Sequence, residues 1–214
     1  METTYKYLGV PLGSMDYVKT VIDGEYDIKD IQFNEQPLAL DIGANMGSYT
    51  HWVQGRFGAK VIAYEPDPNN IRVYLENVPT LKLEFELQPV AITTNPSNNI
   101  LYLSPDNPGA HSLKKSLIGN PYGSVEIKTM SPTDLPEADI IKADCEGCEP
   151  EIFKAYLSKF QPTIVSYEYH TSSDGVELET LLKSKGYTKK GETVYNSSRG
   201  SCNWLDERSN KLCR

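Results

Sequence analysis

Residues 38–50, which read LALDIGANMGSYT, decide the fold of this chain. An apolar run ends in the acidic Asp41, a short turn carries Gly43 and Gly47, and a helical pattern opens at Ser48. This order predicts a buried strand, a glycine turn and a helix whose free N–H groups face the turn. Because glycine lacks a Cβ, the backbone can turn sharply here and approach a ligand closely. The spacing matches neither G-x-G-x-x-G nor a P-loop, and an ordinary strand-to-helix turn is the alternative.

A second acidic residue follows the next predicted strand. Residues 60–64 (KVIAY) are typical of a strand, and Glu65 and Pro66 follow them directly. Glu65 lies about 20 residues beyond the glycine turn, where Rossmann-like folds place a carboxylate that accepts hydrogen bonds from ribose hydroxyls. A solvated loop acid is the alternative. Together the two strand ends indicate a nucleoside site.

A third segment, residues 141–149 (IKADCEGCE), follows another predicted strand. The DIGANMG and YEPDP stretches resemble motif I and the acidic loop of class I S-adenosylmethionine-dependent methyltransferases. The third segment resembles the K-x-D-x-E-G-x-E segment of the FkbM family, as does the E-x-H at Glu168 and His170. The resemblance covers roughly residues 16–170. It implies an S-adenosylmethionine cofactor and O-methylation of a hydroxyl on a sugar or natural product.

Strand and helix patterns alternate through most of the chain, which predicts an α/β fold with a mostly parallel sheet and helices on both faces. The resemblance implies a Rossmann-like class I methyltransferase with seven strands and an antiparallel C-terminal hairpin. The expected strands are 37–42, 60–64, 81–92, 138–143, 163–168, 188–195 and 201–205, and the expected helices are 48–57, 68–78, 150–160 and 175–184.

Two segments fall outside this alternation. Residues 1–36 are expected to form an N-terminal helical or cap segment with a helix over 16–22, either over the cofactor cleft or packed away from it. Residues 37–214 are expected to form the methyltransferase domain, with an insertion at about 93–133. Two strand patterns in the insertion flank a stretch rich in Pro, Gly, Asn and Ser, which predicts a hairpin and a loop over the site.

The resemblance places the cofactor at the ends of the predicted strands. Many class I enzymes carry an acidic residue after the third strand that binds the adenine amine. This chain has Pro89, Val90 and Ala91 there, so backbone groups are expected to serve instead. The expected cofactor-binding residues are Asp41, Gly43, Ala44, Asn45, Gly47, Glu65, Pro66, Val90, Ala91 and Asp144.

The ends of the fourth and fifth predicted strands carry the candidates for the transfer step. Asp144 and Glu146 stand where class I enzymes commonly face the transferred methyl group, and a carboxylate there can act as a general base. His170 is the obvious proton acceptor, because histidine ordinarily titrates near ~6.5. These three are the expected catalytic residues, and His111 and Glu168 are expected to bind the acceptor. The alternative for Glu146 is an acidic residue that stabilises the start of a helix.

Composition limits the partners. The chain has 214 residues and a net charge of −8, which favours one α/β domain and argues against a nucleic-acid partner. No run approaches the ~20 apolar residues of a membrane span, and the N-terminus lacks the order of a signal peptide. We therefore expect a cytoplasmic protein with a small-molecule acceptor, no membrane partner and cysteines present as thiols.

Cys145 and Cys148 form a C-x-x-C pair, but the other two cysteines are spaced poorly for structural zinc. The surrounding pattern is also unlike a thioredoxin unit, so neither a metal nor a redox role is expected. A divalent ion held by Asp144, Glu146 and His170, as in some O-methyltransferases, is a minor alternative. Three functional alternatives stay open: N-methylation of an amine or peptide, an NAD-type oxidoreductase, and a non-catalytic nucleoside-binding module.

Overall fold

The computed structural model describes residues 6–7, 10–11, 20–21, 23–77, 85–105 and 107–213. Its centre is a seven-stranded sheet with the strand order β12-β13-β11-β10-β3-β4-β5. The strands are β3 (Leu38–Ile42), β4 (Lys60–Tyr64), β5 (Phe85–Gln88), β10 (Ile140–Ala143), β11 (Ile164–Tyr169), β12 (Thr188–Val194) and β13 (Gly200–Leu205).

The pairing of these strands confirms the predicted fold class. From β11 to β5 all neighbours are parallel, whereas β13 pairs antiparallel with both β11 and β12. The last two strands are therefore the antiparallel C-terminal hairpin. The parallel strands all end at one edge of the sheet, which is where open α/β sheets bind ligands.

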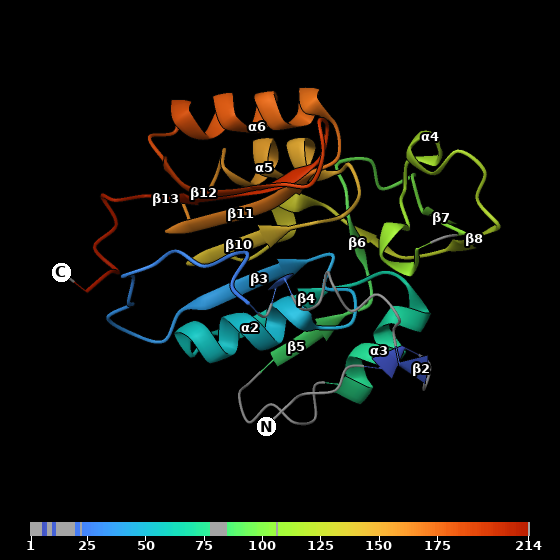
Figure 1. The fold of residues 1–214 in the computed structure, drawn as a ribbon, viewed down its shortest axis with the longest axis horizontal. Helices are drawn as coiled ribbons and strands as arrows, with labels where there is room; N and C mark the ends of the chain where they lie inside the picture. Colours follow the sequence, from blue (N-terminus) through green and yellow to red (C-terminus); the bar gives the residue numbers. More distant parts are fainter. Residues whose placement is uncertain are drawn as a thin grey trace.

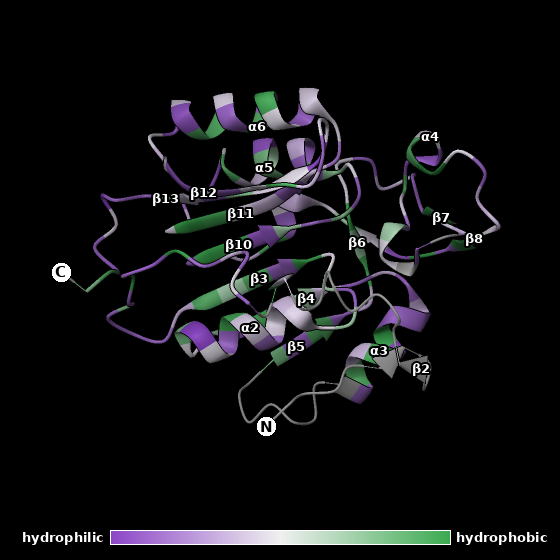
Figure 2. Ribbon diagram, viewed as in Figure 1, coloured by the Kyte–Doolittle hydropathy of each residue, from purple (hydrophilic) through white to green (hydrophobic). Residues whose placement is uncertain are grey.

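Helices cover both faces of the sheet (Figure 1). The helices α2 (Ser48–Phe57) and α3 (Pro68–Asn77) lie on one face, and α5 (Glu149–Tyr156) and α6 (Ser172–Ser184) lie on the other. Every residue of β10 is buried, as expected for a strand covered on both faces. Hydrophobic residues accordingly concentrate in the central strands, while α2 and α6 mix hydrophilic and hydrophobic residues (Figure 2).

Several element boundaries differ from the sequence prediction, most clearly at β5, α6 and α5. The strand predicted over 81–92 is two strands, β5 and β6 (Ala91–Ile92), because Pro89 interrupts the pairing between them; residues 81–84 lie outside the described ranges. Helix α6 begins at Ser172 rather than at 175, since the side chain of Thr171 accepts a hydrogen bond from the backbone N–H of Asp174 and caps it. Helix α5 begins one residue early and ends at Tyr156.

The insertion contains the predicted hairpin at the carboxyl edge of the sheet (Figure 1). Strands β7 (Ile100–Leu103) and β8 (Gly123–Glu126) pair antiparallel, and β9 (Thr129–Met130) pairs parallel with β6. The short helices η2 (Pro108–Ala110) and α4 (Lys115–Ile118) lie between β7 and β8, and η3 (Pro132–Asp134) follows β9. The hydroxyl of Ser112 donates to the backbone carbonyl of Glu146 at 2.7 Å, which ties the insertion to the strand ends.

The N-terminal segment is described only in part. Strands β1 (Lys6–Tyr7) and β2 (Val10–Pro11) pair antiparallel, and most of the helix predicted over 16–22 lies outside the described residues. Tyr26 is buried and packs edge-to-face on Tyr49, with 5.2 Å between ring centroids. No helix within the described ranges is both long and apolar enough to cross a membrane.

Candidate active site

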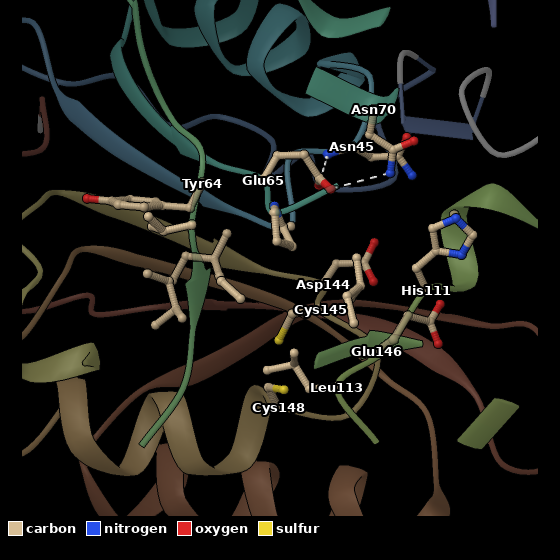
Figure 3. A pocket seen from close by; sticks show the side chains of 18 residues that line it. Asn45, Tyr64, Glu65, Asn70, His111, Leu113, Asp144, Cys145, Glu146 and Cys148 are labelled. Carbon is tan, nitrogen blue, oxygen red and sulfur yellow. Dashed lines mark hydrogen bonds between the residues drawn. The ribbon is translucent and has the colours of Figure 1, made fainter. Parts of the chain in front are cut away.

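Two adjoining cavities open at the carboxyl edge of the sheet. The first, here called the Glu65 cavity, has a volume of about 60 Å³ and is drawn in Figure 3. The second, the Arg199 cavity, has a volume of about 410 Å³. Four residues of the N-terminal segment contribute to the wall of the Arg199 cavity: Thr20, Val21, Glu25 and Tyr26. Residues that line both cavities mark their junction: Gly43, Asn45, Gly109, Asp144 and Glu146.

Glu65 is buried and its carboxylate is bound by the protein itself. Oε2 accepts from the backbone N–H of Asn45 at 2.8 Å, and Oε1 accepts from Asn70 Nδ2 at 3.3 Å (Figure 3). Oε1 also accepts from the backbone N–H of Asp67 at 2.9 Å. Burial raises the pKa of Glu65 to about 7, although these hydrogen bonds lower it. The alternative of a solvated loop acid is therefore excluded.

The glycine turn is tight because two strand ends meet there. Gly43 has a φ of 73°, and a Cβ on it would overlap the carbonyl oxygen of Asp144 and lie 2.7 Å from its carbonyl carbon. The backbone N–H groups of Gly43 and Ala44 both donate to the carbonyl of Tyr64. The backbone of Asp144 is thus a second reason for glycine here, and since Gly43 lines both cavities, its contact with the cofactor stays a prediction.

Asp41 and Gly47, which are expected to contact the cofactor, line neither cavity. Asp41 is fully buried, accepts from Thr50 Oγ1 at 2.8 Å and lies 3.3 Å from Lys142 Nζ. Lys142 Nζ also donates to the carbonyl of Gly43 at 2.9 Å. Asp41 therefore stabilises the turn through its neighbours. Lys142 received no role in the sequence analysis, although it opens the K-x-D-x-E-G-x-E segment.

The remaining expected cofactor residues do line a cavity. Ala44 lines the Arg199 cavity, and Pro66, Val90 and Ala91 line the Glu65 cavity. The N–H groups of Val90 and Ala91 already donate to the carbonyls of Gln88 and Lys128, so these two donors are not free for a ligand. This limits the expectation that backbone groups bind adenine.

The Glu65 cavity also holds unpaired acceptors that fit a nucleoside. Asn45 Oδ1 and Asn70 Oδ1 are buried without a hydrogen-bond partner among the described groups. Carboxamide oxygens accept hydrogen bonds, and ribose hydroxyls donate them. Buried polar groups are normally paired, so these oxygens suit a hydroxyl-bearing ligand. Asn70 was missed because nothing distinguishes it in the sequence from other residues of its helix.

His111 faces the Glu65 cavity from the insertion. Its Nε2 lies 3.1 Å from Asp67 Oδ2, and its Nδ1 accepts from the backbone N–H of Ser104 at 3.0 Å. The ring therefore joins the insertion to the loop that carries Glu65. His111 is expected from the sequence to bind the acceptor; in the structure it lines the Glu65 cavity and not the Arg199 cavity.

Asp144 and Glu146 lie together because the chain turns directly after β10. Glu146 has a φ of 56° and Gly147 a φ of 99°, and this turn brings both carboxylates to the junction of the cavities. Glu149 accepts from the backbone N–H groups of Cys145 and Gly147, at 2.7 and 2.9 Å. Glu149 thus has the helix-start role that was the alternative for Glu146.

His170 is buried beneath these carboxylates, with 2% of its side chain exposed, and lines neither cavity. Its Nε2 lies 3.2 Å from Glu149 Oε1 and 3.6 Å from Asp144 Oδ1, and its Nδ1 lies 3.1 Å from Glu146 Oε2. Burial lowers the pKa of His170, but Glu149, Asp144 and Glu146 raise it to about 12. A raised pKa favours the protonated ring, which cannot accept a further proton, so proton acceptance by His170 stays a prediction and Glu146 is the better placed candidate.

Arg199 is the second cation beside these carboxylates, and the sequence analysis missed it. Its Nη2 donates to both oxygens of Glu146 at 3.0 and 3.1 Å and to Glu168 Oε1 at 3.3 Å. Nη2 also approaches His170 Nδ1 to 2.6 Å. Because a guanidinium can only donate, this contact fits a neutral His170 ring that carries its proton on Nε2, whereas a doubly protonated ring would turn Nδ1–H to Glu146 and away from Arg199. Glu168 lines the Arg199 cavity, as expected for an acceptor-binding residue.

Burial and repulsion between carboxylates raise the pKa of Glu146 and Glu168. Burial raises the pKa of Glu146 to about 7, with His170 and Arg199 opposing the rise. Burial and the neighbouring Asp144 raise the pKa of Glu168 to about 9. Of the acids at the junction, Glu146 therefore titrates nearest neutral pH, as a general base requires.

One group of potential metal ligands occurs within the described ranges. Asp144, Glu149 and His170 offer ligand atoms within 4.8 Å of one another. These atoms are already engaged, since Glu149 binds two backbone N–H groups and His170 Nε2 directs its proton at Glu149. Lys142 and Arg199 also supply positive charge here. We therefore assign no metal to this group.

Comparison with known proteins agrees with this geometry. Residues 41–189 match the family described as the methyltransferase FkbM domain. The chain is 27% identical over 169 residues to the hexuronic acid methyltransferase AglP of Haloferax volcanii, covering 74% of this chain and 68% of that protein.

Solved structures of other methyltransferases share the fold. Precorrin-6y C5,15-methyltransferase of Geobacter metallireducens superposes with a TM-score of 0.53 at 13% identity, over 96% of this chain and 93% of that one. TYW2 of Pyrococcus horikoshii, solved in complex with MeSAdo, gives a TM-score of 0.51 at 16% identity, over 87% of this chain and 61% of that one. At such identities the likeness shows the fold alone.

Proposed function

This chain belongs to the FkbM family of S-adenosylmethionine-dependent methyltransferases, and we propose that it methylates a hydroxyl group on a sugar. The family excludes the oxidoreductase and the non-catalytic module as alternatives. The sugar is supported by the relative named hexuronic acid methyltransferase. We keep the cytoplasm as the proposed compartment, on the sequence argument.

We assign the Glu65 cavity to the cofactor and the Arg199 cavity to the acceptor. We place the nucleoside against Glu65, Asn45 and Asn70, where buried acceptors meet ribose hydroxyls. The Arg199 cavity, with its larger volume and its carboxylates, is the side open to the acceptor. The cofactor's reactive centre then belongs at the junction, beside Asp144 and Glu146.

The position of Glu146 at this junction carries the proposal. When bound, the cofactor supplies a methyl group that moves from its sulfur to the acceptor oxygen. The carboxylate of Glu146 holds the acceptor hydroxyl in line and takes its proton as the new bond forms. Asp144 and Glu168 orient the acceptor from either side. His170 and Arg199 hold Glu146 in place and stabilise its charged form before it receives the proton.

Mass spectrometry of defined acceptor pairs tests this function. The purified chain is incubated with methyl-labelled S-adenosylmethionine and with glucuronic acid, galacturonic acid, glucose or galactose, which pair an acidic sugar with its neutral counterpart. We expect one labelled methyl on a sugar oxygen and much slower transfer by Glu146→Gln. Label on an amine, or equal rates in both proteins, would overturn the proposal. The uronic acids should be preferred if the acceptor resembles that of the named relative.

A further inference from the structure

Arg199 lies beyond residue 189, where the family match ends, yet its backbone is held in a defined turn between β12 and β13. Asn196 Oδ1 accepts from the backbone N–H groups of Ser198 and Arg199 at 2.9 and 3.0 Å. The backbone N–H of Tyr195 donates to the carbonyl of Arg199 at 3.0 Å. The hairpin therefore directs the Arg199 side chain at the ends of β10 and β11.

The guanidinium of Arg199 makes its contacts through one nitrogen. Nη2 reaches both oxygens of Glu146 and one oxygen of Glu168. Its Nε is buried without a partner among the described groups, and the side chain, 35% exposed, lines the Arg199 cavity. His170 is sealed beneath the carboxylates, so Arg199 is the cation that faces Glu146 from the side of the acceptor.

Charged groups from several elements surround Glu146. Negative carboxylates and burial favour its protonated form, while the two cations favour its ionised form. The insertion adds His111, which lines the Glu65 cavity with Glu146. The groups that act on Glu146 are Asp144 after β10, Glu149 on α5, Glu168 on β11, His170 after β11 and Arg199 on the hairpin.

We propose that Arg199 is a positioning residue for methyl transfer, which orients the Glu146 carboxylate and sets the pH above which it accepts the proton of the acceptor. This inference rests on the proposed role of Glu146 as general base. Without the guanidinium, three carboxylates and the buried surroundings would oppose ionisation of Glu146, and His170 would be its remaining ion-pair partner among the described residues. Glu146 would then remain protonated at neutral pH and could not take a proton.

Carbon-13 NMR of protein labelled at glutamate carboxyl carbons tests this directly and needs no acceptor. The Glu146 signal is assigned by its loss in Glu146→Gln and titrated in the wild type, Arg199→Met, Arg199→Gln and Arg199→Lys. We expect Met and Gln to raise the pKa of Glu146 by about 1–3 pH units, the usual effect of removing a neighbouring opposite charge. Lys keeps the charge and should restore much of the wild-type value.

Arg208→Met is the matched control. Arg208 pairs with Asp206 at 2.7 Å, follows the same hairpin and lines neither active-site cavity, so its loss changes net charge equally. We expect it to leave the Glu146 titration unchanged. An unchanged pKa in folded Arg199→Met or Arg199→Gln would overturn the inference and leave Arg199 a structural contact.

The kinetic counterpart uses the acceptor found by mass spectrometry. In Arg199→Met, the rise of kcat with pH should move to higher pH by the same interval, while the Kd for S-adenosylhomocysteine stays at the wild-type value. A kcat that falls equally at every pH would contradict the inference. If instead Glu146→Gln transfers methyl at the wild-type rate, the base role fails, and the NMR titration still reports whether Arg199 controls Glu146.

Discussion

The Glu65 and Arg199 cavities stabilise negative charge in different ways. Glu65 is bound mainly by backbone N–H groups, whose positions the fold fixes. Glu146 and Glu168 are bound by side-chain cations that arrive from distant parts of the chain. Backbone donors do not titrate and cannot be removed by substitution, whereas Arg199 and His170 can. We therefore expect that single substitutions can remove the groups that stabilise negative charge on the acceptor side, but not the backbone groups that do so on the nucleoside side.

The largest effect is expected where the two sides meet. Gly43→Ala should lower the free energy of unfolding by more than about 4 kcal/mol, because its Cβ overlaps the Asp144 backbone at a positive φ. Gly58→Ala is the control, since Gly58 also has a positive φ, of 65°, but open space around its Cβ. It should cost only about 1–2 kcal/mol, the strain of a left-handed residue. Equal losses in chemical denaturation would show that backbone conformation, and not contact between the strand ends, makes Gly43 necessary.

On the acceptor side, His170→Gln should destabilise the protein by about 3–5 kcal/mol, because it removes one partner of buried, paired carboxylates. The raised pKa of His170 gives the sign of the pH dependence. Its stabilisation is full below its ordinary value near ~6.5 and is lost as the pH rises toward about 12. In urea denaturation, the difference in free energy of unfolding between wild type and variant should therefore narrow from about pH 6 to about pH 9. A gap that widens over this range would mean that His170 is neutral in the folded protein.

On the nucleoside side, Glu65→Gln should weaken binding of S-adenosylhomocysteine by about 1–3 kcal/mol, the range for hydrogen bonds to a charged group. The pKa of about 7 predicts that wild-type affinity rises as the pH passes through neutrality, since the ionised carboxylate accepts hydrogen bonds from ribose. Calorimetry of the variant should show no such rise. A rise that persists in Glu65→Gln would assign it to another group.

The same pKa has the opposite consequence for the unliganded protein. Because the pKa of Glu65 is raised, its contribution to stability is present below about 4.5 and is lost as the pH rises through about 7. Without ligand, the free energy of unfolding of Glu65→Gln should therefore increase relative to that of the wild type as the pH rises across this range. No change in their difference would indicate that Glu65 ionises at its ordinary pKa.

The smallest effect is expected at the insertion. His111→Gln should weaken cofactor binding by about 1 kcal/mol, the net value of a typical hydrogen bond, since it loosens the contact with Asp67. The Glu146 titration should not change. An increase in the acceptor KM that exceeds the loss of cofactor affinity would support the acceptor-binding role expected for His111 from the sequence.

Sequence patterns predicted the parts of the fold that depend on local chemistry. The apolar runs and glycine turn located β3 and α2, and the acid after KVIAY located Glu65. The start of α6 was predicted too late. The helical pattern is clear only from residue 175, whereas the side chain of Thr171 caps a helix that begins at Ser172. The break between β5 and β6 follows from Pro89, which lacks the N–H that continued pairing requires.

The site was harder to predict because its charges come from separate elements. The sequence placed Asp144, Glu146 and His170 at strand ends but did not predict how deeply each is buried. It therefore did not distinguish His170, which lines neither cavity, from Glu146, which lines both. Arg199 stands in a Ser-Ser-Arg-Gly turn with no motif, and only tertiary packing brings it to Glu146.

Calorimetric titration of S-adenosylhomocysteine into Glu65→Gln and Glu146→Gln, paired with single-turnover methyl transfer, tests the division of the site most directly. We predict that Glu65→Gln loses about 10- to 100-fold in affinity, as loss of a charged hydrogen bond implies. Glu146→Gln should bind like the wild type but transfer methyl about 10²–10⁴-fold more slowly, the usual contribution of a general base. Equal losses of affinity in both variants, or wild-type transfer by Glu146→Gln, would contradict the assignment of Glu146 to the transfer step.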